Sequence, residues 1–218
     1  MDGVKIKTYL APPLDEQEAL RYALCGVDTD DKVKGSLRAC IYESEGQFSY
    51  RVCYVVMDRE KLLAEFPKNE QERLLSRVLG AEKVVVFCAT VGLGIDRLVN
   101  GYSRIDTEKA LLFQALGTER VESLCDVFCE DMQAEHAPLF VGGRFSPGYG
   151  NLPLQMQQTV FALLNCQKHI GVTLGDGLLM TPTKSVTAFL PLYTTAHKST
   201  AGCAACNKQD CVARKENT

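Results

Sequence analysis

The run Lys83 to Thr90, KVVVFCAT, is the stretch that most limits what this chain can fold into. Between Val84 and Ala89 every side chain is apolar, and three of them are consecutive valines. A strand that is apolar at successive positions has to bury both faces, because neighbouring side chains point to opposite sides of a sheet. We therefore expect Lys83–Thr90 to be a central strand that other elements cover on both sides.

Helical and strand patterns surround this run. Apolar spacing and capping residues predict helices over Asp15–Gly26, Thr29–Ile41, Asn69–Gly80, from Gly94 or Ile95 onward, Asp106–Gln133 and Leu152–Leu164. Further strands are expected at Phe48–Val56, Pro138–Val141, Leu178–Thr181 and Ser185–Leu190. Gly117 and Thr118 are the residues at which the longest helix could break. The pattern predicts an α+β fold: a single mixed domain with a central antiparallel or mixed sheet and long helices.

Composition excludes several classes of protein. The chain has 218 residues, of which 46% are hydrophobic and 23% charged, as in ordinary folded domains. A net charge of −3 gives no electrostatic reason to expect nucleic acid or an anionic membrane as partner. No apolar run approaches the ~20 residues that span a bilayer, and no signal peptide is visible. We expect the ten cysteines to be reduced thiols of a cytoplasmic protein.

The loop Arg144–Gly150, RFSPGYG, is the first candidate for a binding site. Pro147, Gly148 and Gly150 exclude a regular helix and allow unusual backbone angles. The loop is expected between a strand and the amino end of a helix, where free N–H groups favour carboxylates and phosphates. An arginine and a tyrosine there suit a ligand with a carboxylate and an aromatic or cationic part. The alternative is a structural turn with Arg144 in a surface ion pair.

This loop is part of a series of landmarks that occur in order along the chain. They are Arg144, Pro147-Gly148-Tyr149, the helix end Lys168-His169-Ile170-Gly171, Met180, Pro182 and Ser185-Val186, with Ala115-Leu116, Glu122 and Asp126 upstream. With these landmarks and gaps the chain resembles the activation module of cobalamin-dependent methionine synthase. The resemblance covers roughly Val84 to Leu190.

The resemblance implies a ligand, S-adenosylmethionine, and a role for five residues. In that family the module gives the ligand's methyl group to a cobalamin that oxidation has inactivated. Carried over to this chain, Glu122 approaches the ammonium group and Arg144 the carboxylate of the methionine moiety. Tyr149 offers its ring to the sulfonium or the adenine, and Ser146 and Gly148 contribute backbone groups. Read from spacing alone, Glu122 and Asp126 are a solvated acidic stripe.

The resemblance also divides the chain and suggests how it works. Residues 1–82 are expected to be an N-terminal helical and strand extension, 83–195 the S-adenosylmethionine-binding core and 196–218 a cysteine-rich tail. A cobalamin-binding D-x-H-x-x-G loop is missing, so cobalamin must arrive on a partner, a methionine synthase or related corrinoid protein. We expect a stand-alone subunit that supports reductive methylation with an external reductase, without a catalytic residue or turnover of its own.

The tail departs from the larger member of the family, in which paired tyrosines form one wall of the ligand pocket. Here the chain carries Cys203, Cys206 and Cys211 instead. Three thiolates at this spacing favour zinc or an iron–sulfur cluster. The family resemblance implies the same, since stand-alone relatives of the module end in similar cysteine clusters. The alternative is a tail whose thiols stay reduced and bind nothing.

Two other functions stay open at this point: a metal or iron–sulfur accessory protein of a corrinoid system, and an autonomous small-molecule methyltransferase. The second needs a general base, and the sequence offers no convincing one. His169 lies at a helix end and is expected to be structural.

Two motifs resemble other sites. Gly92-Leu93-Gly94 follows the central strand as in a dinucleotide fingerprint, but Arg97 stands where the third glycine belongs, so we interpret it as a strand-to-helix turn. Cys125 and Cys129 share a helix face, where apolar neighbours favour core packing over metal binding.

Overall fold

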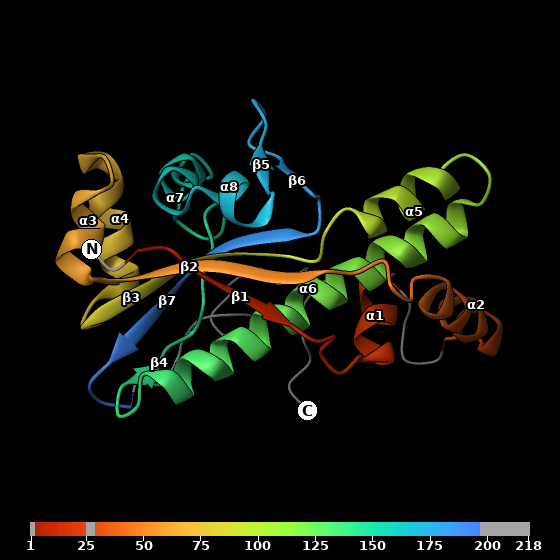
Figure 1. The fold of residues 1–218 in the computed structure, drawn as a ribbon, viewed down its shortest axis with the longest axis horizontal. Helices are drawn as coiled ribbons and strands as arrows, with labels where there is room; N and C mark the ends of the chain where they lie inside the picture. Colours follow the sequence, from red (N-terminus) through yellow and green to blue (C-terminus); the bar gives the residue numbers. More distant parts are fainter. Residues whose placement is uncertain (1–2, 25–28, 197–218) are drawn as a thin grey trace.

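The strand expected at Lys83–Thr90 is β3, the middle strand of a five-stranded sheet (Figure 1). The computed structural model of the chain describes residues 3–24 and 29–196. The strands follow one another across the sheet in the order β1-β2-β3-β7-β4, and each neighbouring pair is antiparallel. The predicted fold class, a single mixed domain built on an antiparallel sheet and long helices, is confirmed.

The remaining elements have the following bounds. The strands besides β3 are β1 Lys5–Tyr9, β2 Tyr50–Asp58, β4 Phe140–Val141, β5 Thr173–Leu174, β6 Met180–Thr181 and β7 Ser185–Tyr193. The helices are α1 Glu16–Tyr22, α2 Asp31–Glu43, α3 Arg59–Ala64, α4 Lys68–Val78, α5 Gly94–Tyr102, α6 Thr107–Glu135, α7 Met156–Leu164 and α8 Cys166–Ile170. β5 and β6 form a separate hairpin that projects from the side of α8 (Figure 1).

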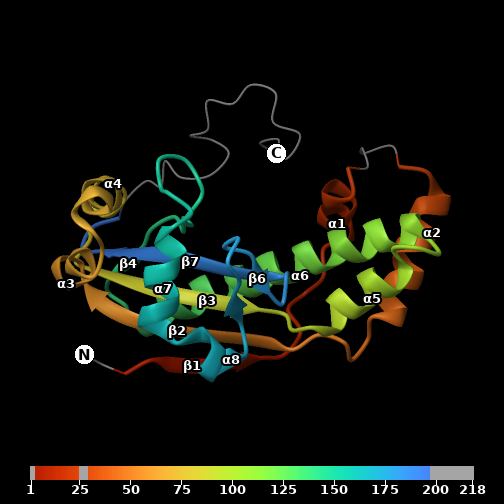
Figure 2. The same ribbon diagram turned by 90° about the horizontal axis from the view of Figure 1, so that it is seen from above.

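β3 is covered on both faces, as its apolar run predicts. Val85 and Phe87 point into one hydrophobic cluster, which α1, α2, α5 and α6 complete. Val84 and Val86 point into the other, with apolar residues of α3, α4, α7 and α8. All four of these side chains are fully buried. Figure 2 shows the consequence from above: α7 lies over one face of the sheet, and α6 runs along the other.

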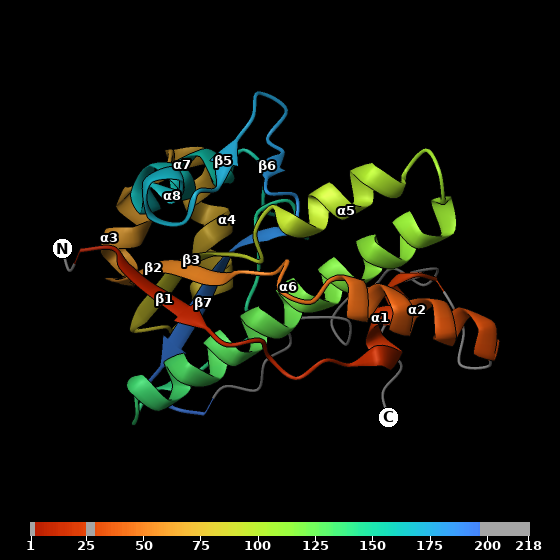
Figure 3. The same ribbon diagram turned by 45° about the vertical axis from the view of Figure 1, so that its right-hand side comes forward.

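The longest helix, α6, organises the second half of the domain. Asp106 caps it, since its carboxylate accepts a hydrogen bond from the Lys109 N–H at 3.0 Å. Its amino-terminal half extends past the sheet and packs against α1, α2 and α5 (Figures 1 and 3). Gly117 does not interrupt it: a Cβ there would lie 2.9 Å from Lys184 and 3.0 Å from Ile95, so this glycine lets α5 and the residue before β7 come close.

Three expectations about the elements were wrong in detail. No strand was expected before Asp15, although Lys5–Tyr9 forms the edge strand β1 beside β2. The helix expected from Leu152 begins only at Met156, because residues 150–155 form turns. The strand expected at Leu178–Thr181 shrinks to Met180–Thr181, since Leu178 has a positive φ of 59°.

The glycines after β3 form a turn, as interpreted, because both neighbours of β3 are antiparallel and no parallel crossover is present in the described part of the chain. Gly92 has φ +83°, and a Cβ at Gly94 would lie 2.0 Å from the Gln47 carbonyl oxygen. Both glycines therefore let the segment before β2 pack against the end of β3.

The first 82 residues supply β1 and β2 to the same sheet as β3 and β7.

No helix among the described residues is both long and apolar enough to cross a lipid bilayer.

Candidate functional site

Phe145 fixes the position of Arg144. Its backbone exchanges two hydrogen bonds with Phe189 of β7, at 3.1 and 2.9 Å, and the two rings stack with centroids 5.4 Å apart. The guanidinium of Arg77 lies over the Phe145 ring, 5.1 Å from its centroid. Because consecutive side chains of an extended chain point to opposite faces, burial of Phe145 against α4 and β7 directs Arg144 toward α6.

There Arg144 meets two carboxylates. Its Nη2 donates to Glu122 Oε2 at 2.7 Å and to Asp126 Oδ1 at 2.9 Å. The two acids are one turn apart on α6, so they present their carboxylates on the same side of the helix. The side chains are 24% exposed for Arg144, 36% for Glu122 and 61% for Asp126. The cluster therefore lies at the surface, open to solvent on the side of Asp126.

The electrostatics of this cluster favour its charged form. Burial lowers the pKa of the Arg144 guanidinium, but Cys125, Glu122 and Asp126 raise it, and the net shift is upward. Burial also raises the pKa of the Tyr22 phenol on α1, and the charge of Glu122 raises it further. Glu122 therefore acts electrostatically on Tyr22 and is bound by Arg144.

The loop after Arg144 is a tight turn. The Gly148 N–H donates to the Leu152 carbonyl at 3.0 Å, and the Tyr149 N–H donates to the Ser146 carbonyl at 3.3 Å. Gly148 has φ +86°, and a Cβ there would lie 3.0 Å from the Leu154 side chain, so the turn requires glycine at this position. Tyr149 is 74% exposed, and its ring extends into solvent.

Of the five predicted site residues, the structure brings two into contact, Glu122 and Arg144. It adds Asp126, which the sequence analysis gave as a landmark of the resemblance and as part of an acidic stripe, without a role toward a ligand. Its spacing of four from Glu122 was the available signal. It also shows Arg144 in the surface ion pair that was the alternative interpretation. The roles of Ser146, Gly148 and Tyr149 toward a ligand stay predictions, since the first two hold the turn and the third is exposed.

A different ion pair lies deeper on α6. Arg120 is bound to the carboxylate of Glu119, with Nη2 2.6 Å from Oε1, and it also donates to the carbonyls of Pro12 and Pro13, both at 2.7 Å. The Glu119 carboxylate accepts further hydrogen bonds from Ser123 and from the backbone of Asp15. The side chains of Arg120 and Glu119 are only 4% and 1% exposed. The pair ties the segment before α1 to α6.

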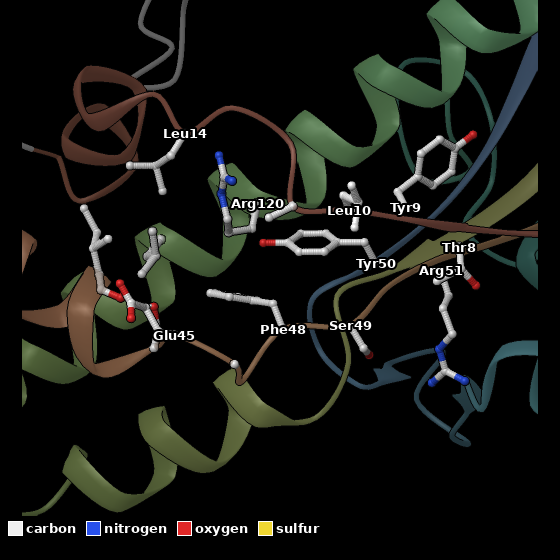
Figure 4. A pocket seen from close by; sticks show the side chains of 15 residues that line it. Thr8, Tyr9, Leu10, Leu14, Glu45, Phe48, Ser49, Tyr50, Arg51 and Arg120 are labelled. Atoms are coloured by element: carbon white, nitrogen blue, oxygen red, sulfur yellow. The ribbon is translucent and has the colours of Figure 1, made fainter.

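A cavity of about 570 Å³ opens beside Arg120 (Figure 4). Phe48 and Tyr50 stack along one wall, with ring centroids 5.9 Å apart. In Figure 4 the Tyr50 ring lies between Arg120 and Phe48, whereas Arg51 points away from them toward β5 and β6. The Arg120 donors bind Glu119 and the proline carbonyls, so Arg120 is already occupied. The rest of the cavity offers mostly apolar surface, with Glu45 and Arg51 as its other charged lining residues.

The cysteines among the described residues behave as core residues. Cys40, Cys53, Cys88, Cys125 and Cys166 are buried, and Cys129 is partly buried. Burial raises the pKa of the Cys129 thiol to about 11, which keeps it neutral. No group of three or more His, Cys, Asp or Glu side chains in residues 3–24 and 29–196 is arranged to hold a metal ion. The predicted metal ligands Cys203, Cys206 and Cys211 lie outside the described residues.

Comparison with known families decides what kind of domain this is. Residues 77–215 match the family described as vitamin B12 dependent methionine synthase, activation domain. The chain belongs to this family. The resemblance seen from roughly Val84 to Leu190 is thereby confirmed, and the match also includes the three cysteines of the tail. A search of curated proteins found no match to this chain.

The fold of this activation domain is also found among solved structures. One match is described as a crystal structure of the MetH reactivation domain bound to AdoHcy. The TM-score is 0.66 at 15% sequence identity, over 91% of this chain and 81% of that one. At this identity the likeness establishes the shared fold, which includes the antiparallel sheet and the long helices described above.

Proposed function

We propose that this activation domain binds S-adenosylmethionine between Arg144 and Glu122 and supports reductive methylation of cobalamin on a partner methionine synthase. The observation that carries the proposal is the contact of these two side chains, which are 22 residues apart in sequence and 2.7 Å apart at the surface. A guanidinium beside a carboxylate matches the carboxylate and ammonium of an amino acid. Membership of the activation-domain family and the AdoHcy named in the similar structure point to the same ligand.

The residues present fit that ligand. In the described part of the chain Arg144 uses Nη2 for both carboxylates, so Nε and Nη1 remain for a ligand carboxylate. An ion pair as exposed as Arg144 with Asp126 contributes about 0–1 kcal/mol, so a zwitterion can open it easily. The two ends of the ligand then replace the pair: its carboxylate meets Arg144 and its ammonium meets Glu122. Tyr149 is exposed and lies in the same loop as Arg144. Its aromatic ring is the group proposed to contact the sulfonium or the adenine.

The domain's contribution to the reaction is placement. The partner supplies cobalamin as the methyl acceptor, and a reductase supplies one electron to its cob(II)alamin form. The methyl group leaves the sulfonium without its bonding electrons, which stay on sulfur and give neutral S-adenosylhomocysteine. No side chain of this domain has to take or give a proton. Holding the methyl donor in line with the acceptor is an effect of proximity, which contributes strongly to rates in general.

The test is a reconstituted reactivation assay. Inactive cob(II)alamin synthase, a low-potential reductant and S-adenosylmethionine are mixed with this protein, and absorbance spectra follow the cobalamin. We expect methylcobalamin to form only with all components present, and the protein alone to bind no cobalamin. Reactivation at the same rate without the protein would contradict the proposal.

An affinity measurement adds a second readout. If S-adenosylmethionine favours the docked state, it must tighten association with the synthase, and the synthase must tighten its binding by the same factor. Unequal factors in a closed thermodynamic cycle would mean that the two binding events were measured in different states. No change in either affinity would argue against a docked complex that presents the ligand.

For the tail we retain the proposal of zinc or an iron–sulfur cluster on Cys203, Cys206 and Cys211. Protein purified without oxygen should contain zinc or iron by elemental analysis, and replacement of the three cysteines by serine should remove it. A cluster would add visible absorbance that bleaches with dithionite. Metal-free wild-type protein in which all three thiols react readily with an alkylating agent would contradict this part.

A further inference from the structure

The cluster around Arg144 carries more negative than positive charge. One guanidinium is shared by two carboxylates, Glu122 and Asp126, which leaves a net charge of about −1 when both acids are ionised. An amino acid zwitterion needs only one carboxylate and one guanidinium. The second carboxylate is therefore surplus to recognition of the zwitterion.

The neighbouring groups do not cancel this surplus. Arg21 of α1 is held by Glu18, with Nη2 2.7 Å from Oε1, so that pair is neutral as a unit. The thiol of Cys129, one turn along the helix from Asp126, stays neutral because burial raises its pKa. Among the described residues, the charge that faces solvent at this point of α6 is thus the carboxylate of Asp126, the most exposed of the three ion-pair partners.

We infer that Asp126 is a specificity-determining residue, whose surplus charge makes the site prefer the sulfonium ligand S-adenosylmethionine over its thioether product S-adenosylhomocysteine. The inference rests on the proposed function. The two ligands share the zwitterion, the ribose and the adenine, and they differ by one methyl group and one positive charge. A carboxylate that the zwitterion does not use attracts the sulfonium and has no charge to attract in the product.

This preference has a consequence for the reaction. Methyl transfer removes the positive charge of the ligand inside the site, so the interaction with Asp126 is lost at the step that makes product. The domain then releases S-adenosylhomocysteine more readily than it releases S-adenosylmethionine. A donor site that has to be refilled after each methylation benefits from such a difference, because a tightly held product would compete with the next donor.

The test compares three ligands on three proteins by isothermal titration calorimetry. The ligands are S-adenosylmethionine, S-adenosylhomocysteine and sinefungin, which carries an ammonium group in place of the sulfonium. The proteins are the wild type, Asp126→Asn and the control Glu130→Gln. Glu130 lies four residues further along the exposed side of α6, so its replacement removes the same charge from the same helix without touching Arg144. Thermal melts of the three proteins check that each is folded.

The readout is the ratio of the affinities for the charged and the neutral ligand. Asp126→Asn can also loosen Arg144, but this changes both ligands alike and cancels in the ratio. We expect the wild type and Glu130→Gln to bind S-adenosylmethionine and sinefungin more tightly than S-adenosylhomocysteine. In Asp126→Asn the affinity ratio should be about threefold to fivefold smaller, as expected for two unit charges a few ångströms apart in water. The loss should shrink at 0.5 M salt.

The outcomes separate this inference from the proposed function. An unchanged ratio in Asp126→Asn, with all three ligands still bound, overturns the role of Asp126 and leaves the ligand site intact. An equal loss in Glu130→Gln overturns it as well, because the effect would then come from the charge of the whole helix. If the wild type binds none of the three ligands, the proposed function fails and this inference fails with it.

Discussion

Two arginines bind acids of the same helix, and they do so in opposite ways. Arg120 and Glu119 are almost completely buried, and their polar atoms also bind Pro12, Pro13, Ser123 and the backbone of Asp15. Arg144 joins α6 from a loop, and its partners Glu122 and Asp126 are 36% and 61% exposed. The first pair connects parts of the fold, whereas the second presents opposite charges to solvent.

The difference shows which features of an ion pair indicate structure and which indicate binding. A buried pair whose donors and acceptors are all used cannot exchange a partner without unfolding its surroundings. A half-exposed pair is weak and can exchange partners with a ligand of matching charge. Distance does not separate the two cases, since both arginines have contacts of 2.6 to 2.7 Å. The two pairs differ instead in how deeply they are buried and in whether all their hydrogen-bonding groups already have partners.

The largest effect is expected for Arg120→Ala. Removal of the guanidinium leaves Glu119 buried without its partner and leaves the Pro12 and Pro13 carbonyls without their donor. We expect the free energy of unfolding in urea to fall by about 3–5 kcal/mol. The double variant Glu119→Leu with Arg120→Met should recover part of this loss. A loss below about 1 kcal/mol in Arg120→Ala would remove the contrast between the two pairs.

Arg144→Ala should act on the ligand instead. We expect binding of S-adenosylmethionine to weaken by about 2 kcal/mol or more, roughly 30-fold, because a charge-assisted pair is lost. The stability of the free protein should change by less than about 1 kcal/mol. Arg104→Ala, at an exposed position between α5 and α6, is the matched control for calorimetry. Equal binding by the wild type and Arg144→Ala would exclude Arg144 from the site.

Tyr149 tests whether the loop adds an aromatic contact to the ion pair. Tyr149→Ala should weaken binding by about 1 kcal/mol, and Tyr149→Phe by less, since a cationic group interacts with the ring face. Tyr42 on α2 is exposed to a similar degree, 76% against 74%, so Tyr42→Ala serves as the control. If Tyr149→Phe weakened binding as much as the alanine variant, the hydroxyl and not the ring would be the group that matters.

A third ion pair on α6 should give the smallest effect. Lys7 of β1 donates to Asp131 at 2.9 Å, and this hydrogen bond, with that of Tyr9, lowers the pKa of Asp131 from 3.8. A lowered carboxylate pKa stabilises the fold above pH 3.8, and the contribution is lost as the pH falls through the lowered value.

Because this pair is exposed, its contribution should stay below about 1 kcal/mol. Asp131→Asn should therefore flatten the acid side of the stability curve slightly, as urea unfolding between pH 2 and 5 can show. A flattening as large as the loss in Arg120→Ala would mean that exposure does not predict the strength of ion pairs on this helix.

The core of the fold could be predicted from the sequence, and its edges could not. β3 and α6 are dense in apolar residues at strand and helix spacing, so their patterns are unambiguous. β1 is an edge strand with three of its five side chains exposed, and such a strand carries no apolar alternation. α7 begins four residues late because the turn after Gly150 uses residues that also suit a helix.

The site was predictable in its residue types but not in its contacts. The loop composition and the family resemblance indicated Arg144 and Glu122. Asp126 and Glu122 both bind Arg144 because the bridge between Phe145 and Phe189 sets the distance of the loop from α6. Contacts between residues 44 positions apart have no local signature. The saturation of Arg120 by proline carbonyls is likewise a property of the folded chain.

A crystal structure of this chain with S-adenosylmethionine tests the central claim most directly. The account predicts the ligand carboxylate within hydrogen-bonding distance of the Arg144 guanidinium and the ligand ammonium beside Glu122, with the Arg120–Glu119 pair unchanged. A ligand bound in the cavity beside Phe48 and Tyr50, with Arg144 still paired to Glu122 and Asp126, would contradict it.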